Sequence, residues 1–188
     1  MSAIVLYIIS YSSTLKISIL TGKEIKKEVE SGRIIISPFE EKCLAPNSYI
    51  YHLENKLLEI IEVGDINKDP LTKEIILPQD GFVLEPNKLY LGTTVEEIGS
   101  QHFVTSLSGR NSIGKLGMFL QITADLGQLG KSHKWTLEIH VIKKLRIYPF
   151  MEVGKVTFWQ PKGEIDYGNE EFYSTQNSPY PSKLFKRL

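Results

Sequence analysis

The stretch Trp135-Thr136-Leu137-Glu138-Ile139-His140-Val141 alternates apolar and polar side chains without a break. Successive side chains of a strand point to opposite faces, so this alternation predicts a half-buried β-strand with its apolar residues on one face. Glu138 then lies on the other face, between Thr136 and His140. A carboxylate in the middle of a half-buried strand either faces solvent or has a partner or a chemical function.

Shorter strand-like runs lie on both sides of this stretch, separated by Gly, Pro, Asn and Asp. We expect strands at residues 57–63, 74–77, 82–84, 89–95, 103–107, 117–122, 145–148 and 155–159. Two short helices are expected: one after Thr21, where Glu24 completes a capping box and Gly32 ends the helix, and one over residues 111–116. Many short strands with a few short helices predict a mostly β single domain, either a sandwich or a barrel.

The composition favours one ordered domain without a broadly charged surface. The 188 residues are 41% hydrophobic, and 22 basic side chains balance 22 acidic ones. A chain without net positive charge is a poor general binder of nucleic acid or of membrane surfaces. Cys43 is the only cysteine, which excludes an internal disulfide framework and a cysteine-rich zinc site. An anionic ligand would therefore need a local cluster of positive side chains.

The two ends of the chain differ in composition from residues 19–160, which we expect to form the β domain. Residues 1–18 are expected to be an N-terminal extension that precedes the first predicted helix. Their apolar run is far shorter than the ~20 residues of a membrane span, so it does not predict a membrane anchor. They also lack the features of a signal peptide, so we expect a cytoplasmic protein. Residues 161–188 are rich in Tyr, Pro and amide side chains and end in basic residues. This composition fits a solvated tail or a segment that closes over a ligand or a neighbouring subunit.

A second informative segment is Ser106-Leu-Ser-Gly-Arg-Asn-Ser-Ile-Gly-Lys-Leu-Gly117, where an expected strand passes into the second short helix. Gly109 permits a close backbone approach, Arg110 offers a bidentate donor, and Ser112 adds a hydroxyl. Together with the N–H groups at the helix start, these groups are able to hold a phosphate. The same residues are also compatible with an ordinary turn and a solvated arginine.

Other catalytic chemistries find no support in the sequence. The histidines, which are His52, His102, His133 and His140, show no paired spacing of metal ligands. Nucleophile-elbow, P-loop and dinucleotide motifs are absent, and so is the His-x-Glu and Pro-Cys-x-x-Cys signature of the zinc-dependent base deaminases. This chain would therefore deaminate a nucleobase only by a route without zinc.

Taken in order along the chain, its segments resemble the dCTP deaminase branch of the dCTP deaminase/dUTPase superfamily. The clearest piece is Gly109-Arg-Asn-Ser-Ile-Gly-Lys-Leu-Gly117, followed by Thr123-Ala124 and Trp135-Thr-Leu-Glu138. The other matching pieces are residues 19–25, 44–49, 82–86, 91–96 and 148–154, and Gln176 with residues 179–184. Their order makes the set specific, although no single piece is decisive.

The resemblance implies a distorted β-barrel of the β-clip or jelly-roll-like type, assembled as a homotrimer with active sites shared between subunits. It implies hydrolytic deamination of dCTP to dUTP and ammonia in pyrimidine deoxynucleotide metabolism. The implied cofactor is Mg²⁺ bound through the triphosphate, with no metal ligand from protein side chains and no zinc. The ligands would be dCTP and dUTP, with dTTP as a candidate regulator, and neither nucleic acid nor a membrane would be a partner.

The resemblance also assigns roles to individual residues. Glu138 would be the general acid/base, the Ala124 carbonyl would help hold the attacking water, and Asn111 would orient water. Lys115 would place a cation near the base from an adjacent subunit. The nucleotide would be held by Arg110 and Ser112 at the phosphates, Gln128 at the deoxyribose, backbone groups of Trp135 and Thr136 at the pyrimidine edge, and Tyr167, Tyr173 and Gln176 in a tail that closes over the site.

Five positions depart from the family pattern: Asn111 replaces a serine, Lys115 an arginine, Gln128 an aspartate, Lys131 an aromatic residue and Phe172 a lysine. The diphosphatases of the superfamily use an aspartate at the place of Gln128 to activate water, and an amide cannot act as that base. A pure dUTP diphosphatase is therefore a weaker hypothesis than the deaminase. The remaining alternatives are a bifunctional dCTP deaminase/dUTPase and a catalytically impaired nucleotide-binding or structural trimer.

Overall fold

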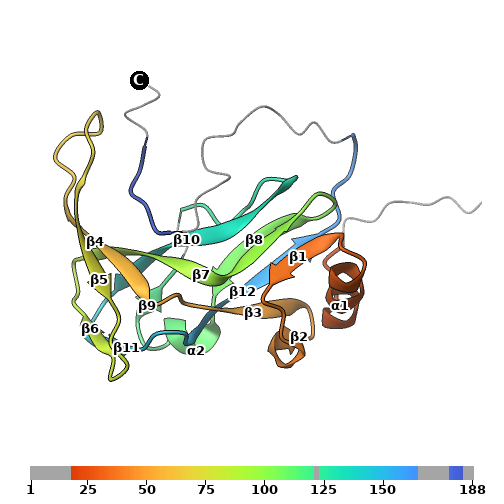
Figure 1. The fold of residues 1–188 in the computed structure, drawn as a ribbon, viewed down its shortest axis with the longest axis horizontal. Helices are drawn as coiled ribbons and strands as arrows, with labels where there is room; N and C mark the ends of the chain where they lie inside the picture. Colours follow the sequence, from red (N-terminus) through yellow and green to blue (C-terminus); the bar gives the residue numbers. More distant parts are fainter. Residues whose placement is uncertain (1–17, 121–122, 165–177, 184–188) are drawn as a thin grey trace, which may run out of the picture.

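The computed structural model describes residues 18–120, 123–164 and 178–183, and it consists mostly of antiparallel strands (Figure 1). Its helices are α1 (Gly22–Glu30), the single 3-10 turn η1 (Glu41–Cys43) and α2 (Asn111–Gly114). Its strands are β1 (Ile34–Ser37), β2 (Leu44–Ala45), β3 (Ser48–His52), β4 (Lys56–Glu62), β5 (Leu71–Ile76), β6 (Phe82–Leu84), β7 (Leu89–Ser100), β8 (Val104–Gly109), β9 (Met118–Phe119), β10 (Lys131–Val141), β11 (Leu145–Ile147) and β12 (Glu152–Trp159).

The strands form two larger sheets and one two-stranded ribbon. The first sheet has the order β5-β4-β7-β10-β9, with β1 also paired to β7. The second has the order β2-β3-β12-β8, and β6 pairs with β11. The long strands β7 and β10 run side by side across the middle of the molecule (Figure 1). The prediction of a mostly β single domain with a few short helices is confirmed.

Apolar side chains from both sheets form one continuous core. On β10 the buried side chains are those of Trp135, Leu137, Ile139 and Val141, which are the alternate positions that the sequence predicted. The second sheet contributes Leu107, Val156 and Phe158 to the same cluster. Full burial of such a side chain contributes about 1.5–3 kcal/mol to folding. The shared core therefore holds the two sheets in a fixed relation.

A close approach between β3 and β12 supports the end of β8. Gly154 of β12 lies against the ring of Tyr51, and a Cβ at position 154 would come within 2.0 Å of the Tyr51 Cζ and hydroxyl oxygen. The Tyr51 hydroxyl donates to the Ser108 carbonyl oxygen at 3.2 Å. Only glycine leaves room for this packing, which joins three strands directly before Arg110.

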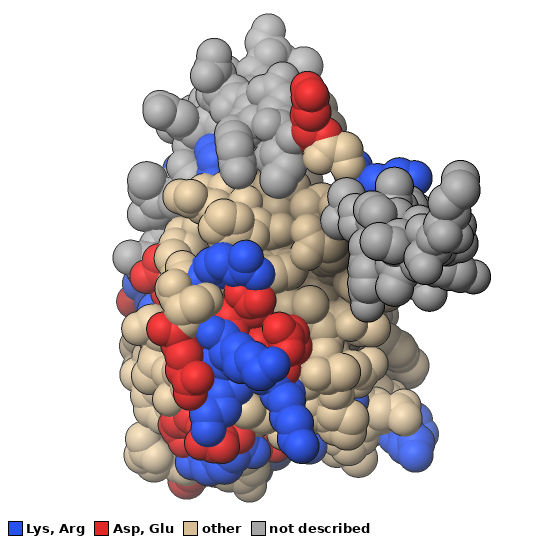
Figure 2. Space-filling model, turned by 90° about the vertical axis from the view of Figure 1, so that its right-hand side faces the viewer, with Lys and Arg blue, Asp and Glu red and all other residues tan. Residues whose placement is uncertain are grey.

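Charged side chains of both signs mix on the face seen in Figure 2. Ion pairs near α1 join Lys26 to Glu41 at 2.8 Å and Lys27 to Glu24 at 2.9 Å. This face therefore presents no extended patch of one sign, in keeping with the balanced composition. Among the helices that the structure describes, none combines the length and apolar character of a membrane span.

Most of the predicted elements are present, but several differ in extent, and the strands β1 and β2 were not predicted. The helix α1 begins where expected, and the Thr21 hydroxyl accepts a hydrogen bond from the Glu24 N–H at 3.4 Å. Strand β7 continues to Ser100 because β1 and β10 both pair with its second half. Strand β3 was not predicted, since its definition depends on the distant β12. Strand β9 begins after Gly117, which has a φ of 82°, and it is shorter than the predicted 117–122.

Candidate active site

Glu138 lies in the second half of β10, opposite Leu91 of β7. Its neighbours Leu137 and Ile139 are fully buried, whereas Glu138 is half-buried on the other face of the strand. Among the residues that the structure describes, none forms a hydrogen bond or ion pair with the Glu138 carboxylate. A carboxylate that is held on a rigid strand and has no partner there can take a proton from a bound water.

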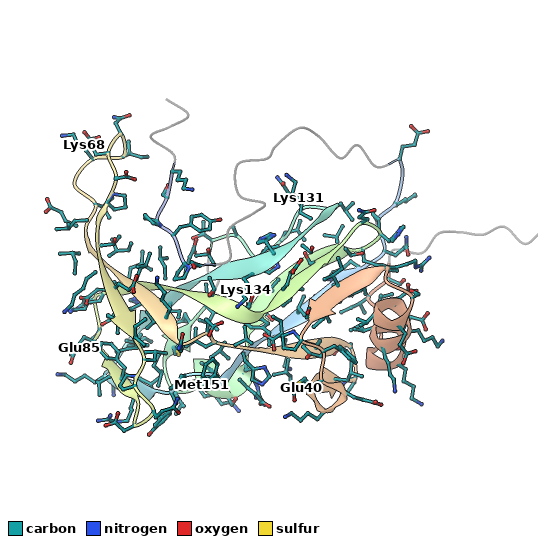
Figure 3. All side chains as sticks on the ribbon, in the orientation of Figure 1. Glu40, Lys68, Glu85, Lys131, Lys134 and Met151 are labelled. Carbon is teal, nitrogen blue, oxygen red and sulfur yellow. The ribbon has the colours of Figure 1, made fainter. Side chains whose placement is uncertain are left out.

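A bulge near the start of β10 determines how Trp135 is held. The register with β7 shifts between Lys134 and Thr136. The Trp135 N–H donates to the Thr94 hydroxyl oxygen at 2.9 Å, and the indole N–H donates to the Ile98 carbonyl oxygen at 3.0 Å. Figure 3 shows Lys131 and Lys134 on this part of the strand, where the Lys134 Nζ lies 2.8 Å from the Glu54 Oε2. The Trp135 side chain is therefore part of the scaffold, and a role for Trp135 and Thr136 in reading the pyrimidine through the backbone stays a prediction.

Trp135 also supports the chain segment that precedes β10. His133 stacks on its ring, with ring centroids 4.7 Å apart. Gly127 lies against the other end of the indole, because a Cβ at position 127 would come within 2.1 Å of the Trp135 Cη2. Burial lowers the pKa of His133, which favours its neutral form. This stack was not predicted, and its signal in the sequence was the spacing of two aromatic rings on one strand.

Arg110 occupies the N-cap of α2, directly after β8. Its N–H donates to the Val153 carbonyl oxygen at 3.0 Å, and its own carbonyl oxygen accepts from Ile113 and Gly114 at 3.0 Å. These bonds fix the turn against β12. The guanidinium is 29% exposed and forms an ion pair with Glu152. The cation on which the predicted phosphate site depends therefore already has an anionic partner, which the sequence analysis missed.

The remaining predicted residues of this turn are exposed. Asn111, Ser112 and Lys115 all face solvent, and the Lys115 N–H closes the turn by donating to the Asn111 carbonyl oxygen at 3.1 Å. In the part of the chain that the structure describes, the Lys115 ammonium has no ion-pair partner. The first N–H groups of a helix have no partner inside the helix. The turn thus presents hydroxyl, amide and backbone N–H donors, together with the Lys115 ammonium, which has no ion-pair partner among the described residues.

The segment 123–128 lies along the edge of β8, beside the residues that lead into Arg110. The Leu107 N–H donates to the Asp125 carbonyl oxygen, and the Gly127 N–H donates to the Thr105 carbonyl oxygen, both at 2.8 Å. Ala124 and Gln128 of this segment are exposed. Two hydrogen bonds to a core strand hold an otherwise exposed segment in place, so its backbone has a fixed position relative to β8.

Asp125 points from this segment toward an open cleft. Its carboxylate accepts a hydrogen bond from the Ser106 hydroxyl at 3.2 Å. The cleft has a volume of about 400 Å³ and is lined by Val104, Ser106, Asp125, Leu126, Trp159, Gln160, Pro161 and Lys162. Asp125 was not among the predicted site residues. The family pattern has an aspartate at the position of Gln128, and Asp125 places a carboxylate three positions before it. This nearby carboxylate was the signal in the sequence.

The structure thus places the predicted residues on three neighbouring elements of one chain. Arg110, Asn111, Ser112 and Lys115 share the α2 turn, Ala124 and Gln128 share the segment beside β8, and Trp135, Thr136 and Glu138 share β10. The predicted tail residues Tyr167, Tyr173 and Gln176 lie outside the described residues, as does Phe172. Within the described ranges, no group of three or more His, Cys, Asp and Glu side chains is arranged to hold a metal ion.

The fold resembles that of one solved member of a class of nucleotide deaminases. It matches the crystal structure of 2'-deoxycytidine 5'-triphosphate deaminase from Agrobacterium tumefaciens with a TM-score of 0.63 and 17% sequence identity. The match covers 77% of this chain and 48% of that chain. At this identity the likeness concerns the fold alone.

The sequence comparisons identify the family within this class. The family model described as dCTP deaminase-like matches residues 19–161, so the chain belongs to this family. A protein named "dCTP deaminase, dUMP-forming" from Hathewaya histolytica is 41% identical over 169 residues, which cover 89% of this chain and 98% of that one. Proteins of the same name from Clostridium beijerinckii and Leptospira biflexa are also 41% identical over 169 residues, 89% of this chain and 97% of each of theirs. The predictions of the family and of an enzyme of this class are confirmed.

Proposed function

We propose that this chain is a bifunctional hydrolase that removes ammonia from C4 of dCTP and then releases pyrophosphate, so that dUMP is its final nucleotide product. Support comes from the family and from the name shared by relatives that match most of both chains. The first expectation from the sequence was a deaminase that stops at dUTP. The relatives' name favours the bifunctional alternative.

The observation that carries the deaminase half is the half-buried Glu138 carboxylate, which has no partner among the described residues. In the proposed reaction, a water held by this carboxylate and the Ala124 carbonyl gives a proton to Glu138 while its oxygen bonds to C4. Protons then pass by way of Glu138 to N3 and to the amino group. The C4–N bond breaks, ammonia leaves, and C4 becomes a carbonyl.

The α2 turn supplies the groups that would bind the nucleotide phosphates. Arg110 would exchange Glu152 for a phosphate oxygen, and Ser112 would donate from its hydroxyl. Asn111 would orient the attacking water. Gln128 would contact the deoxyribose, the backbone at Trp135 and Thr136 would read the pyrimidine edge, and Tyr167, Tyr173 and Gln176 would close over the triphosphate.

A magnesium ion bound to the triphosphate belongs to the same proposal. Its coordination through the nucleotide follows from the resemblance to the family. Such an ion would neutralise part of the phosphate charge. The protein groups around it would be the Arg110 guanidinium and the hydroxyl and amide donors of the α2 turn.

A homotrimer with shared active sites also remains a proposal. Lys115 is the residue that would reach the base of an adjacent subunit, and its ammonium is open in the described part of the chain. Large apolar side chains near α2 are exposed as well: Leu116 by 59%, Phe119 by 39% and Ile142 by 59%. Exposed apolar groups of this size next to a polar turn are typical of an interface between subunits.

The test is incubation of the purified chain with Mg²⁺ and either dCTP or dUTP, followed by separation of the products. Ammonia and dUMP from dCTP, together with dUMP from dUTP, support the bifunctional enzyme. Ammonia and dUTP alone would limit the chain to deamination. If neither substrate reacts while both bind, the chain is the catalytically impaired nucleotide binder.

The Glu138→Gln variant tests the catalytic assignment directly. It preserves the shape of the side chain and removes the base, so ammonia release should fall by roughly 10²–10⁴-fold while dCTP still binds. Glu62→Gln, an exposed change at the end of β4, is the matched control and should behave as the wild type. Normal turnover of dCTP by the Glu138→Gln variant would show that another group is the acid/base.

A further inference from the structure

The proposed release of pyrophosphate requires a group that takes a proton from water at the phosphates. Gln128 stands where the family pattern has the aspartate for this step, and a neutral amide has no basic lone pair for it. Glu138 is assigned to the pyrimidine ring, and Glu152 would give up its place at Arg110 to a phosphate oxygen, whose negative charge would repel the Glu152 carboxylate. The second half of the reaction therefore needs another carboxylate.

Asp125 is the only carboxylate in the segment 123–130, which carries both Ala124 and Gln128. The backbone bond between the Leu107 N–H and the Asp125 carbonyl oxygen, at 2.8 Å, ties this residue to β8. The Ser106 hydroxyl then orients its side chain by donating to the carboxylate at 3.2 Å. A single neutral hydrogen bond leaves the remaining lone pairs of the carboxylate available for water.

The surroundings of Asp125 are open and largely apolar, with one positive charge. The carboxylate lines a cleft of about 400 Å³ to which Lys162 contributes a positive charge. Leu126 and Trp159, which are 66% and 38% exposed, provide apolar surface in the same cleft. Water and a substrate can thus reach the carboxylate, and β8 leads from it to the phosphate-binding turn at Arg110.

We propose that Asp125 is the general base of the pyrophosphate-releasing step and replaces the carboxylate that is missing at position 128. This inference rests on the proposed function, because it concerns the second of its two reactions. Ser106 acts as a positioning residue that holds the carboxylate by its hydroxyl.

The step balances as a hydrolysis of dUTP. The oxygen of a water bonds to the α-phosphorus while its proton passes to the Asp125 carboxylate. The bond between the α-phosphorus and the oxygen that bridges it to the β-phosphorus breaks, and pyrophosphate leaves with the electron pair. The products are dUMP and pyrophosphate, and the proton on Asp125 is returned to solvent.

The experiment supplies wild type, Asp125→Asn, Asp125→Glu and the control Asp69→Asn with dUTP and with dCTP in the presence of Mg²⁺. Asp69 lies exposed between β4 and β5, outside the proposed site. We expect Asp125→Asn to form dUMP roughly 10²–10⁴-fold more slowly from dUTP and to accumulate dUTP when given dCTP. Asp125→Glu, which keeps a carboxylate, should retain measurable dUMP formation, and Asp69→Asn should match the wild type.

The outcomes separate this inference from the proposed function. If the wild type itself yields no dUMP, the bifunctional proposal fails and the role of Asp125 fails with it. If the wild type yields dUMP and Asp125→Asn does so at the same rate, only the role of Asp125 is overturned. Equal loss of ammonia and dUMP in both Asp125 variants, with an unchanged unfolding temperature, would also overturn it, because a dedicated base affects one step alone.

Discussion

Two arginine–glutamate pairs in this molecule differ in how firmly they are held. Arg33 donates to both oxygens of Glu28, with its Nε at 2.5 Å and its Nη2 at 2.6 Å, and the Glu28 side chain is only 10% exposed. Arg110 forms an ion pair with Glu152, and the Glu152 side chain is 43% exposed. The first pair anchors the chain after α1, whereas a second anion could displace Glu152 from the other pair. The comparison is consistent with a structural role for Arg33 and with the ligand-binding role proposed for Arg110.

The largest effect that would test this contrast is expected for Arg110→Ala. Loss of a charge-assisted donor to phosphate should weaken dCTP binding by about 1.5–3 kcal/mol, or roughly 10- to 150-fold. Binding is measured by calorimetry in a Glu138→Gln background, which prevents turnover. Arg33→Ala is the matched control and should lower the unfolding temperature without this loss of affinity. Equal binding by the Arg110→Ala variant would remove Arg110 from the phosphate site.

The next effect concerns stability. Glu28→Gln should reduce the free energy of unfolding by about 1–2 kcal/mol, because it removes the charge from a bidentate pair of which the arginine is half exposed. Arg33 would keep its position over the Phe103 ring, at 5.4 Å from the centroid. Denaturant unfolding of the variant measures the loss. Rates of ammonia release per folded molecule should stay at the wild-type level, and a fall in those rates would contradict a purely structural pair.

The same pair predicts a dependence of stability on pH. The hydrogen bond from Arg33 holds the pKa of Glu28 below its usual 4.5. The unfolded chain therefore binds a proton at a higher pH than the folded chain, so the stabilisation is complete above about pH 4.5 and is lost as the pH falls below that value. Unfolding free energies measured between pH 3 and pH 6 should decrease less steeply toward acid for Glu28→Gln than for the wild type. Parallel curves would show that the pair does not contribute.

Local patterns in the sequence were sufficient to predict the structure of the part of the candidate site that lies on β10. The alternation from Trp135 to Val141 predicted the strand, the buried face and the half-exposed position of Glu138, because these depend only on the two-residue period of a strand. The capping box at Thr21 was equally local. The order of the family motifs then predicted the turn at Arg110 as the second part of the candidate site.

Contacts between distant segments were not predictable in this way. Glu152 meets Arg110 only because β12 pairs with β8 in a particular register, with Gly154 opposite Gly109. The hydrogen bond from Ser106 to Asp125 likewise requires the segment 123–128 to lie beside β8. Neither arrangement leaves a periodic signal in the sequence. The partners of the functional groups, rather than the groups themselves, were therefore the information that the structure added.

The smallest predicted effect tests whether Glu152 competes with the nucleotide. Glu152→Gln removes a negative charge beside Arg110 and keeps a side chain of similar size, so dCTP should bind more tightly by about 0.2–1 kcal/mol, or up to roughly fivefold. The gain should disappear when Arg110→Ala is also present, because the two residues act through one ion pair. Calorimetric titration of both single variants and the double variant measures the coupling. Weaker binding by Glu152→Gln would mean instead that Glu152 orients the guanidinium toward the phosphate. The Arg110–Glu152 pair would then support the structure of the site, as the Arg33–Glu28 pair supports the fold.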